Sequence, residues 1–546
     1  MTTLRSIYFL MQADLLERVR RYSFMIVMGI TVMAGYLLVP PFGAPYTSFV
    51  IGSHRGFYNS PWVGTLYGVV TCTLLALVGF YLVKNTVQRD DQTMVGQIIA
   101  ATPIRKPFYT LGKWLSNLAV LVLILLALSL IAPIMQYVRA EDTSIELWAL
   151  VAPIWIMGLP ALAVVSAIAV LFECIPFLRG GLGNVVYFFI WGPVLVGSTI
   201  GSATDFSLNS TPRNDFAGLS RTLISIYQSL DAGGYDASYG VTGVIGPVMG
   251  EKITRFNWDG ISWTADMLLE RLMWLGGAAA IALAASIPFD RFDPACSKLL
   301  QRQRKRKHPP EASQDRTEQN GLFTHAEYPT QTVYLTQPAI SNSTLKLQNF
   351  WLITFAELRL MLKGLHWVWY IVSIGLIVAC LFSPLQIVQR HLLPIAWVLP
   401  ILIWSQMGTR EKNYDTWQII FSTANPIRCQ LPAMWFAGVV IAVITGSGAI
   451  IRFASYGAWM NLFAWIVGAL LIPALAFSLG VWSGSRRLFE LVYLFWWYLA
   501  YNGLVAWDFI GITPDALERG NPWLFLGLIP ILLAASVFGR WRQLRG

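Results

Sequence analysis

Residues 89–114 read RDDQTMVGQIIAATPIRKPFYTLGKW, and residues 410–435 read REKNYDTWQIIFSTANPIRCQLPAMW. Both stretches are polar, and each lies between two apolar runs. A Pro-Ile-Arg tripeptide occurs in both, slipped by two residues. A polar loop that occurs twice, each time after a second apolar segment, predicts a duplicated membrane unit. Six further positions are identical at one constant offset, namely Arg89, Gln97, Ile98, Ile99, Thr102 and Trp114, and their counterparts Arg410, Gln418, Ile419, Ile420, Thr423 and Trp435.

The composition is that of a polytopic membrane protein. The chain has 546 residues, of which 55% are hydrophobic and 12% charged, and its mean hydropathy is +0.55. Soluble domains carry about 25% charged residues, and many apolar runs here reach the ~20 residues that cross a bilayer. The 23 tryptophans and 21 tyrosines fit aromatic belts at the membrane surfaces. The net charge of +10 does not indicate nucleic-acid binding, because the basic residues collect in loops on one side.

Twelve apolar spans are predicted, in two modules of six. The first module covers residues 1–289 and the second covers 345–546, and the polar stretch 290–344 between them predicts a flexible cytoplasmic linker. An amphipathic helix is predicted before each set, at 7–22 and 350–363, either lying in the membrane interface or extending the first span. The spans are expected at about 23–41, 62–83, 114–137, 147–172, 182–199, 268–288, 365–383, 393–408, 434–453, 457–482, 488–506 and 522–539.

The placement of charge predicts the orientation. Loop 84–113 and the C-terminal tail are rich in lysine and arginine, whereas loop 200–267 is acidic. By the positive-inside rule, both termini and the linker are cytoplasmic, loop 200–267 is outside, and the expected location is the plasma (inner) membrane. The outer loop is interpreted either as a gate or as a tolerated insertion. Its residues Phe256, Trp258 and Trp263 predict that part of it packs on the outer membrane face.

No pattern of a catalytic, cofactor or metal site occurs, so we expect a chain that is not an enzyme. Walker A, HExxH and GxSxG motifs are absent, the five histidines are dispersed, and no CxxC pair occurs. Carboxylates are nearly absent from span centres. Glu173 and Glu490 occupy matching cytoplasmic span ends, where salt bridges to Arg179 or Arg487 are expected rather than a proton relay.

The repeated loop is the candidate docking site. In each copy, Gln-Ile-Ile precedes a proline, which predicts a short helix that ends before the proline. Its isoleucines would fill a groove on a partner and its arginine would contact carboxylates at the rim; the alternative is a helix on the membrane surface with the isoleucines in lipid. The predicted docking residues are Gln97, Ile98, Ile99, Thr102, Pro103 and Arg105 in the first copy, and Gln418, Ile419, Ile420, Thr423, Pro426 and Arg428 in the second.

These features resemble the ABC-2 type permeases. That family has an amphipathic helix, six spans, a charged loop with a short helix between spans two and three, and an outer element between spans five and six. The phrase QIIAATPIR–YTLGKW resembles its coupling helix, and FNWDGISWTADMLLERLMWLG resembles fused members with two permease halves. The resemblance implies an all-α polytopic membrane protein with about 12 transmembrane helices in two six-helix, type V exporter-like repeats. Loop 200–267 departs from the short re-entrant hairpins common in the family.

The resemblance also implies the function, a permease subunit of an ATP-binding cassette exporter. Two separate ATPase subunits, which bind ATP and Mg²⁺, would dock on the coupling helices, and a small amphipathic drug, antibiotic or peptide would be exported. Two other classes stay open. A twelve-span, ion-coupled secondary transporter shares the layout, but it would have a short loop between spans two and three and buried ionisable groups. A polytopic membrane enzyme would need acids, bases or metal ligands that converge at one membrane face.

Overall fold

The computed structural model describes residues 2–41, 44, 46–51, 54–204, 215, 217–233, 241–247, 253–292, 343–363, 365–413, 416 and 426–545. These residues form two units, 1–293 and 294–546, and both are mostly helical. Eight of the described helices are long and apolar enough to cross a membrane, or up to ten if each of two bent helix pairs is one span. The chain is therefore a helical membrane protein, while the count of twelve spans stays a prediction.

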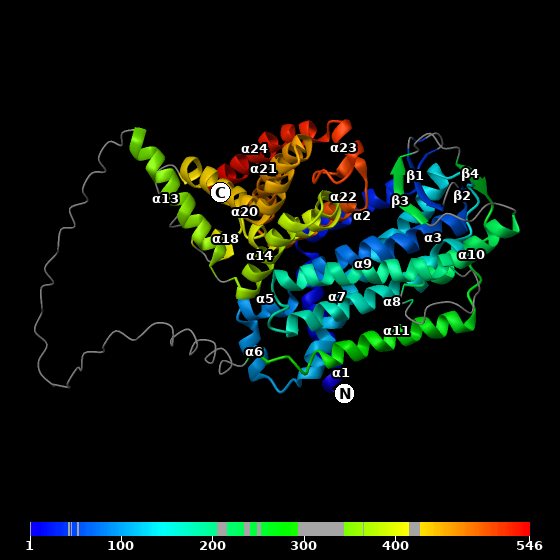
Figure 1. The fold of residues 1–546 in the computed structure, drawn as a ribbon. Coiled ribbons are helices and arrows are strands. Elements are labelled where there is room, and N and C mark those ends of the chain that lie inside the picture. The colour runs from blue at the N-terminus through cyan, green and yellow to red at the C-terminus, as the bar shows by residue number, and fades with distance from the viewer. Residues whose placement is uncertain are drawn as a thin grey trace, which may run out of the picture. The chain divides into compact units, whose positions relative to one another are not determined.

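Unit 1 contains several long helices (Figure 1). Helices α3, η1 and α4 follow one another without a break and cover the second predicted span. The helices are α1 (Thr2–Val19), α2 (Tyr22–Leu38), α3 (Ser60–Val70), the π-helical turn η1 (Thr71–Leu75), α4 (Ala76–Val83), α5 (Thr86–Gln92), α6 (Val95–Ala101), α7 (Lys106–Arg139), α8 (Leu147–Cys174), α9 (Gly181–Thr204), α10 (Leu219–Ala232) and α11 (Ala265–Ala284).

Helix α8 packs against α3, α4, α7 and α11, and most of its residues are buried. Small residues let α3 approach it closely. A Cβ atom added to Gly64 would lie 2.4 Å from the backbone oxygen of Leu150, and one added to Gly68 would lie 3.1 Å from that of Pro153. Glycines spaced four apart on one helix face allow this backbone-to-backbone contact between membrane helices.

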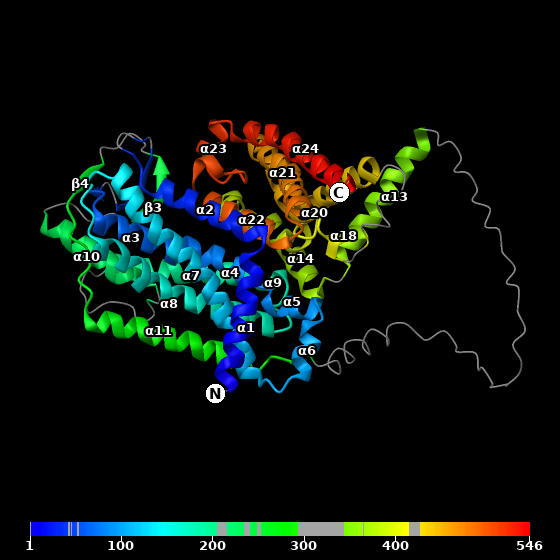
Figure 2. The same ribbon diagram turned by 180° about the vertical axis from the view of Figure 1, so that it is seen from behind.

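The helix predicted at 7–22 is present as α1, Thr2–Val19, which packs against α7 (Figure 2) and leaves Tyr8 and Phe9 exposed. It meets α2 at an angle of 75°. Its residues Met11, Leu15 and Val19 are half-buried, and its acidic residue Asp14 is buried. The helix therefore uses its inner face for packing, and its location in a membrane interface stays a prediction.

A small sheet closes one end of unit 1. Strands β1 (Tyr46–Ile51), β2 (His54–Gly56), β3 (Val241–Pro247) and β4 (Thr254–Phe256) have the order β3-β1-β2-β4. Strand β1 is antiparallel to β2 and β3, whereas β2 and β4 are parallel. The sheet joins the segment after α2 to the predicted outer loop. The prediction of an all-α chain did not include it.

Two aromatic residues of the outer loop, Phe256 and Trp258, pack inside the protein near this sheet. Trp62 of α3 is fully buried and its ring contacts those of Phe49, Phe256 and Trp258, with centroid distances of 5.2, 5.6 and 5.9 Å. Phe256 and Trp258 are 3% and 2% exposed. These two side chains therefore pack inside the protein and not on a membrane face, because the buried indole of Trp62 provides them with an apolar surface. Trp263 is half-buried, and its packing on a membrane face stays a prediction.

Unit 2 is helical in its described residues. Helices α13 and α14 are bent by 107° at their junction, and α22 has only 16 residues, which is short for a membrane span. The helices are α13 (Ser343–Leu362), α14 (Trp367–Phe382), α15 (Leu385–Ile387), η3 (Val388–Leu392), α16 (Leu393–Val398), α17 (Ile401–Trp404), α18 (Arg410–Asn413), α20 (Pro426–Ser455), α21 (Trp459–Ser483), α22 (Arg486–Tyr501), η4 (Val505–Trp507), α23 (Pro514–Glu518) and α24 (Asn521–Arg545).

Candidate functional site

The first copy of the repeated loop folds into α5 and α6, at the end of unit 1 opposite the sheet (Figure 1). Helix α6 ends at Ala101, and both Thr102 and Arg105 have extended backbone, with ψ of 156° and 147°. Proline disfavours helical backbone in the residue before it, so Pro103 ends the helix as predicted. Helix α7 then begins at Lys106, with Pro107 in its first turn.

Helix α6 has an exposed apolar surface. Met94, Val95 and Ile98 are 61%, 42% and 68% exposed, whereas Ile99 is 8% exposed. The two predicted docking isoleucines therefore differ, because only Ile98 is accessible to a partner. We call this surface the α6 face; it consists of Met94, Val95, Gln97, Ile98 and Ala101. Beyond the end of the helix, Pro103, Arg105 and Lys106 are exposed as well.

The opposite side of α6 rests on aromatic rings. A Cβ atom added to Gly96 would lie 2.7 Å from the ring of Phe292, so only glycine fits against that ring. The rings of Tyr109 and Phe289 stack with a centroid distance of 4.8 Å, in the same core as Ile99. Arg291 also donates a hydrogen bond to the carbonyl oxygen of Thr102. Helix α6 is thus attached to α7 and to the segment after α11.

Glu173, at the end of α8, holds the preceding helix α5. Its carboxylate accepts hydrogen bonds from the backbone N–H groups of residues 85–88, at distances up to 3.3 Å, and from the hydroxyl of Thr86. A carboxylate at a helix N-terminus satisfies donors that have no partner within the helix. The expected ion pair to Arg179 is replaced by this contact, and Arg179 donates to the backbone oxygen of Glu173 instead.

Buried charges join α1 to the same loop. The ammonium group of Lys113, on α7, lies 2.7 Å from a carboxylate oxygen of Asp14 and 2.7 Å from one of Asp90. The hydroxyl of Tyr109 donates to Asp90 at 2.7 Å, and Arg89 lies 3.8 Å from Asp14. Lys113 is fully buried. The lysine that the sequence suggested as a basic loop residue is therefore an internal link between α1, α5 and α7.

Most of the second copy of the loop is not among the residues that the structure describes. Gln418, Ile419, Ile420 and Thr423 lie outside the described residues. Helix α20 begins at Pro426, so Arg428 is in its first turn, whereas Pro103 and Arg105 precede α7. The position of the Arg428 side chain is also outside the described part of the structure.

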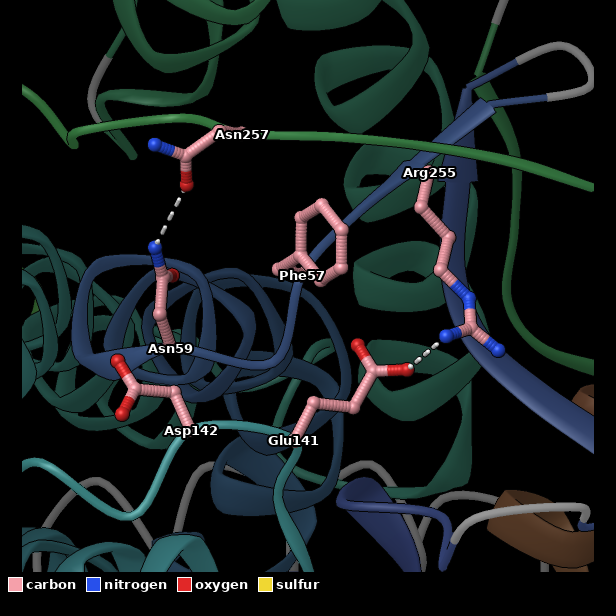
Figure 3. A pocket seen from close by; sticks show the side chains of 6 residues that line it. All are labelled: Phe57, Asn59, Glu141, Asp142, Arg255 and Asn257. Atoms are coloured by element: carbon pink, nitrogen blue, oxygen red, sulfur yellow. Dashed lines mark hydrogen bonds and ion pairs between the residues drawn. The ribbon is translucent and has the colours of Figure 1, made fainter.

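A second candidate site lies at the opposite end of unit 1. A pocket of about 420 Å³ is lined by Phe57, Asn59, Glu141, Asp142, Arg255 and Asn257 (Figure 3). The Phe57 ring lies between the Glu141–Arg255 pair and the side chains of Asn59 and Asp142. Such a pocket offers an aromatic face, carboxylate oxygens and amide groups to a polar ligand.

Glu141 is the most heavily bonded residue of this pocket. Arg55 contacts both of its oxygens, at 2.7 and 2.9 Å, Arg255 lies at 3.1 Å, and the backbone N–H of Tyr58 donates at 3.2 Å. Burial opposes ionisation, but the hydrogen bonds from Arg55 and Tyr58 and the two positive charges outweigh it and hold the pKa of Glu141 below its usual value. The carboxylate thus stays charged and fixes the strand β2 to the end of α7.

Sequence reasoning missed both polar networks, because their members are far apart in the chain. The charged residues Arg89 and Asp90 and the acid Asp14 can be read from the sequence, but no local pattern shows that they pair. Among the described residues, no group of three histidine, cysteine or acidic side chains is arranged to hold a metal ion. Comparisons with protein-family models, curated proteins and solved structures find no match for the chain.

Proposed function

We propose that this chain is the permease subunit of an ATP-binding cassette exporter of the ABC-2 type, driven by separate ATPase subunits that dock on the repeated loop. The observation that carries the proposal is the α6 face. It is apolar, it belongs to a short helix in an otherwise polar loop, and its central residue Ile98 is 68% exposed. Arg105 and Lys106 lie exposed just beyond it, which suits a partner with an apolar groove and an acidic rim.

The attachment of α6 supports a coupling role. Its buried side contacts Phe292, which follows α11, and it leads directly into α7. A force applied to the α6 face would therefore reach two long apolar helices. In the proposed cycle, ATP-driven closure of the ATPase subunits shifts α6, and these helices move with it to open a path for a small amphipathic substrate.

The acids beside α5 and α6 favour this proposal over an ion-coupled transporter, although a fourth buried carboxylate of unit 1, Asp215, lies near Cys72 of η1 and Arg271 of α11. The buried carboxylates Asp14, Asp90 and Glu173 lie beside α5 and α6, where each is bound to a cation or to backbone N–H groups. A proton relay needs ionisable groups within the membrane-spanning segments. The charges of this cluster instead hold the loop in place.

The test is to purify the tagged chain from its own cell membranes in mild detergent, to identify co-purifying subunits by mass spectrometry, and to measure ATP hydrolysis. We expect a subunit with Walker motifs. Ile98→Asp should reduce its recovery roughly 30-fold, the loss of a hot-spot contact. The repeat predicts a similar loss for Ile419→Asp.

Gln92→Asp is the matched control, because it places the same charge on an exposed position of the neighbouring α5. Equal recovery of the ATPase with Ile98→Asp and Gln92→Asp would contradict docking on the α6 face. Transport that follows a proton or sodium gradient in vesicles without any ATPase would support the secondary transporter instead.

A further inference from the structure

The buried ion cluster of unit 1 has a counterpart in unit 2. Glu357 on α13 lies 3.4 Å from Arg410, which begins α18. The side-chain amide of Gln430, on α20, donates to Glu411 at 3.2 Å and lies 3.5 Å from Glu357. Arg540, on α24, donates to the other carboxylate oxygen of Glu411 at 2.9 Å. Glu357, Glu411 and Arg540 are all buried.

Three members of the two clusters correspond at the offset that relates the two copies of the loop. Arg89 matches Arg410, and Asp90 matches Glu411. At the same offset Tyr109 matches Gln430, and each donates to the acid of its own loop. The acids of the amphipathic helices also correspond by place, because α1 packs on α7 and α13 packs on α20.

The cation that completes each cluster comes from a different helix. Lys113 lies on α7, one turn after Tyr109. The matching residue of unit 2 is Met434, which is apolar and buried, one turn after Gln430. A buried carboxylate needs a cation or several hydrogen-bond donors, and Arg540 from the last helix is the cation beside Glu411.

We propose that Arg540 is the unit 2 replacement for Lys113, and that both are positioning residues that clamp the amphipathic helix and the loop of their unit together. The two clamps are not equivalent. In unit 1 the cation beside the loop acid comes from α7, whereas in unit 2 it comes from α24. This inference concerns contacts within each unit and does not depend on the proposed function.

The test moves the charge back to the position that it has in unit 1. In Arg540→Met the acid Glu411 loses its cation, and backbone amides of α18 and of the second half of α13 should exchange with solvent roughly 100-fold faster. In the double variant Arg540→Met/Met434→Lys, a lysine one turn after Gln430 should restore slow exchange, since residues four apart on a helix share a face. Arg540→Lys should retain it.

Two comparisons make the result decisive. Arg542→Met removes an exposed arginine from the same helix and should change nothing. The guanidinium of Arg540 also lies over the ring of Phe477, 5.7 Å from its centroid, and a lysine at position 434 cannot replace that packing. Rescue by Met434→Lys therefore supports the charge role. Amide exchange in Arg540→Met as slow as in the native chain would overturn the proposal. It would also be overturned if the double variant exchanged as fast as Arg540→Met while Arg540→Lys exchanged slowly.

Discussion

Replacing Glu173 with glutamine should release the loop that carries α6. The carboxylate is fully buried at the end of α8, and it accepts the backbone N–H groups of residues 85–88. Glutamine has nearly the same shape, so it leaves the packing of α8 unchanged. Its NH₂ group, however, faces donors that need an acceptor, and its charge no longer complements the N-terminus of α5.

The magnitude follows from the number and kind of these bonds. A hydrogen bond to a charged group contributes about 1.5–3 kcal/mol, and an unsatisfied buried donor costs about 1–3 kcal/mol. The glutamine oxygen can still accept from one pair of amides, so we expect a net cost of about 2–3 kcal/mol for keeping α5 in place. At 1.36 kcal/mol for each factor of ten, local opening becomes roughly 30- to 150-fold more frequent.

Hydrogen exchange measures this opening directly. The peptide that contains residues 85–92 should exchange faster in Glu173→Gln by that factor, while peptides of α3 and of the first half of α8 keep their native rates. Glu146→Gln is the control, because Glu146 is exposed at the other end of α8. Unchanged exchange at residues 85–88 in Glu173→Gln would refute the reasoning that the carboxylate anchors α5.

Three further predictions concern the two ends of unit 1. Gly96→Val should displace α6 from the Phe292 ring and destabilise the loop by about 1–3 kcal/mol, and Phe292→Ala in the same chain should relieve part of that cost; hydrogen exchange of α6 is the measurement. Because the pKa of Glu141 is lower in the folded state, its carboxylate stabilises that state above about pH 4.3, the unfolded pKa, and this stability is lost as the pH falls through the folded pKa. Proteolysis of the sheet, measured as the pH is lowered, should show this acid-dependent loss of stability in the native chain and not in Glu141→Gln. Trp62→Ala should cost about 3–5 kcal/mol, seen as faster exchange in β1 and β4, and native exchange rates would contradict its central place.

The sequence predicted those parts of the fold that depend on local patterns. The apolar runs place a helix at each of the twelve expected spans, and Pro103 ends α6 where predicted. Helices α1 and α13 lie where the sequence predicts a helix before each set of spans. These features need only neighbours in the chain, and hydropathy or backbone geometry determines them.

Contacts between distant residues could not be predicted in the same way. The strands are short, and β2 and β4 have three residues each, so neither has a periodicity that distinguishes it from a loop. Ile98 and Ile99 are adjacent and chemically identical, and only the position of Phe289 and Phe292 decides which of them is covered. The cation for Glu411 lies 129 residues away, at Arg540.

The sheet of unit 1 has a mechanical consequence for the opposite end. Its strand pairings join the connection after α2 to the connection before α11, so they would hold the helix ends on that side at a fixed spacing if the helices tilted. Helix α7 runs from α6 toward the sheet and has 34 residues, which is about 50 Å at 1.5 Å per residue. A tilt of about 5° around the sheet moves the other end of such a helix by about 4 Å. If the proposed transport cycle tilts α7 about the sheet, α6 lies at the end of the helix where a given rotation produces the largest displacement.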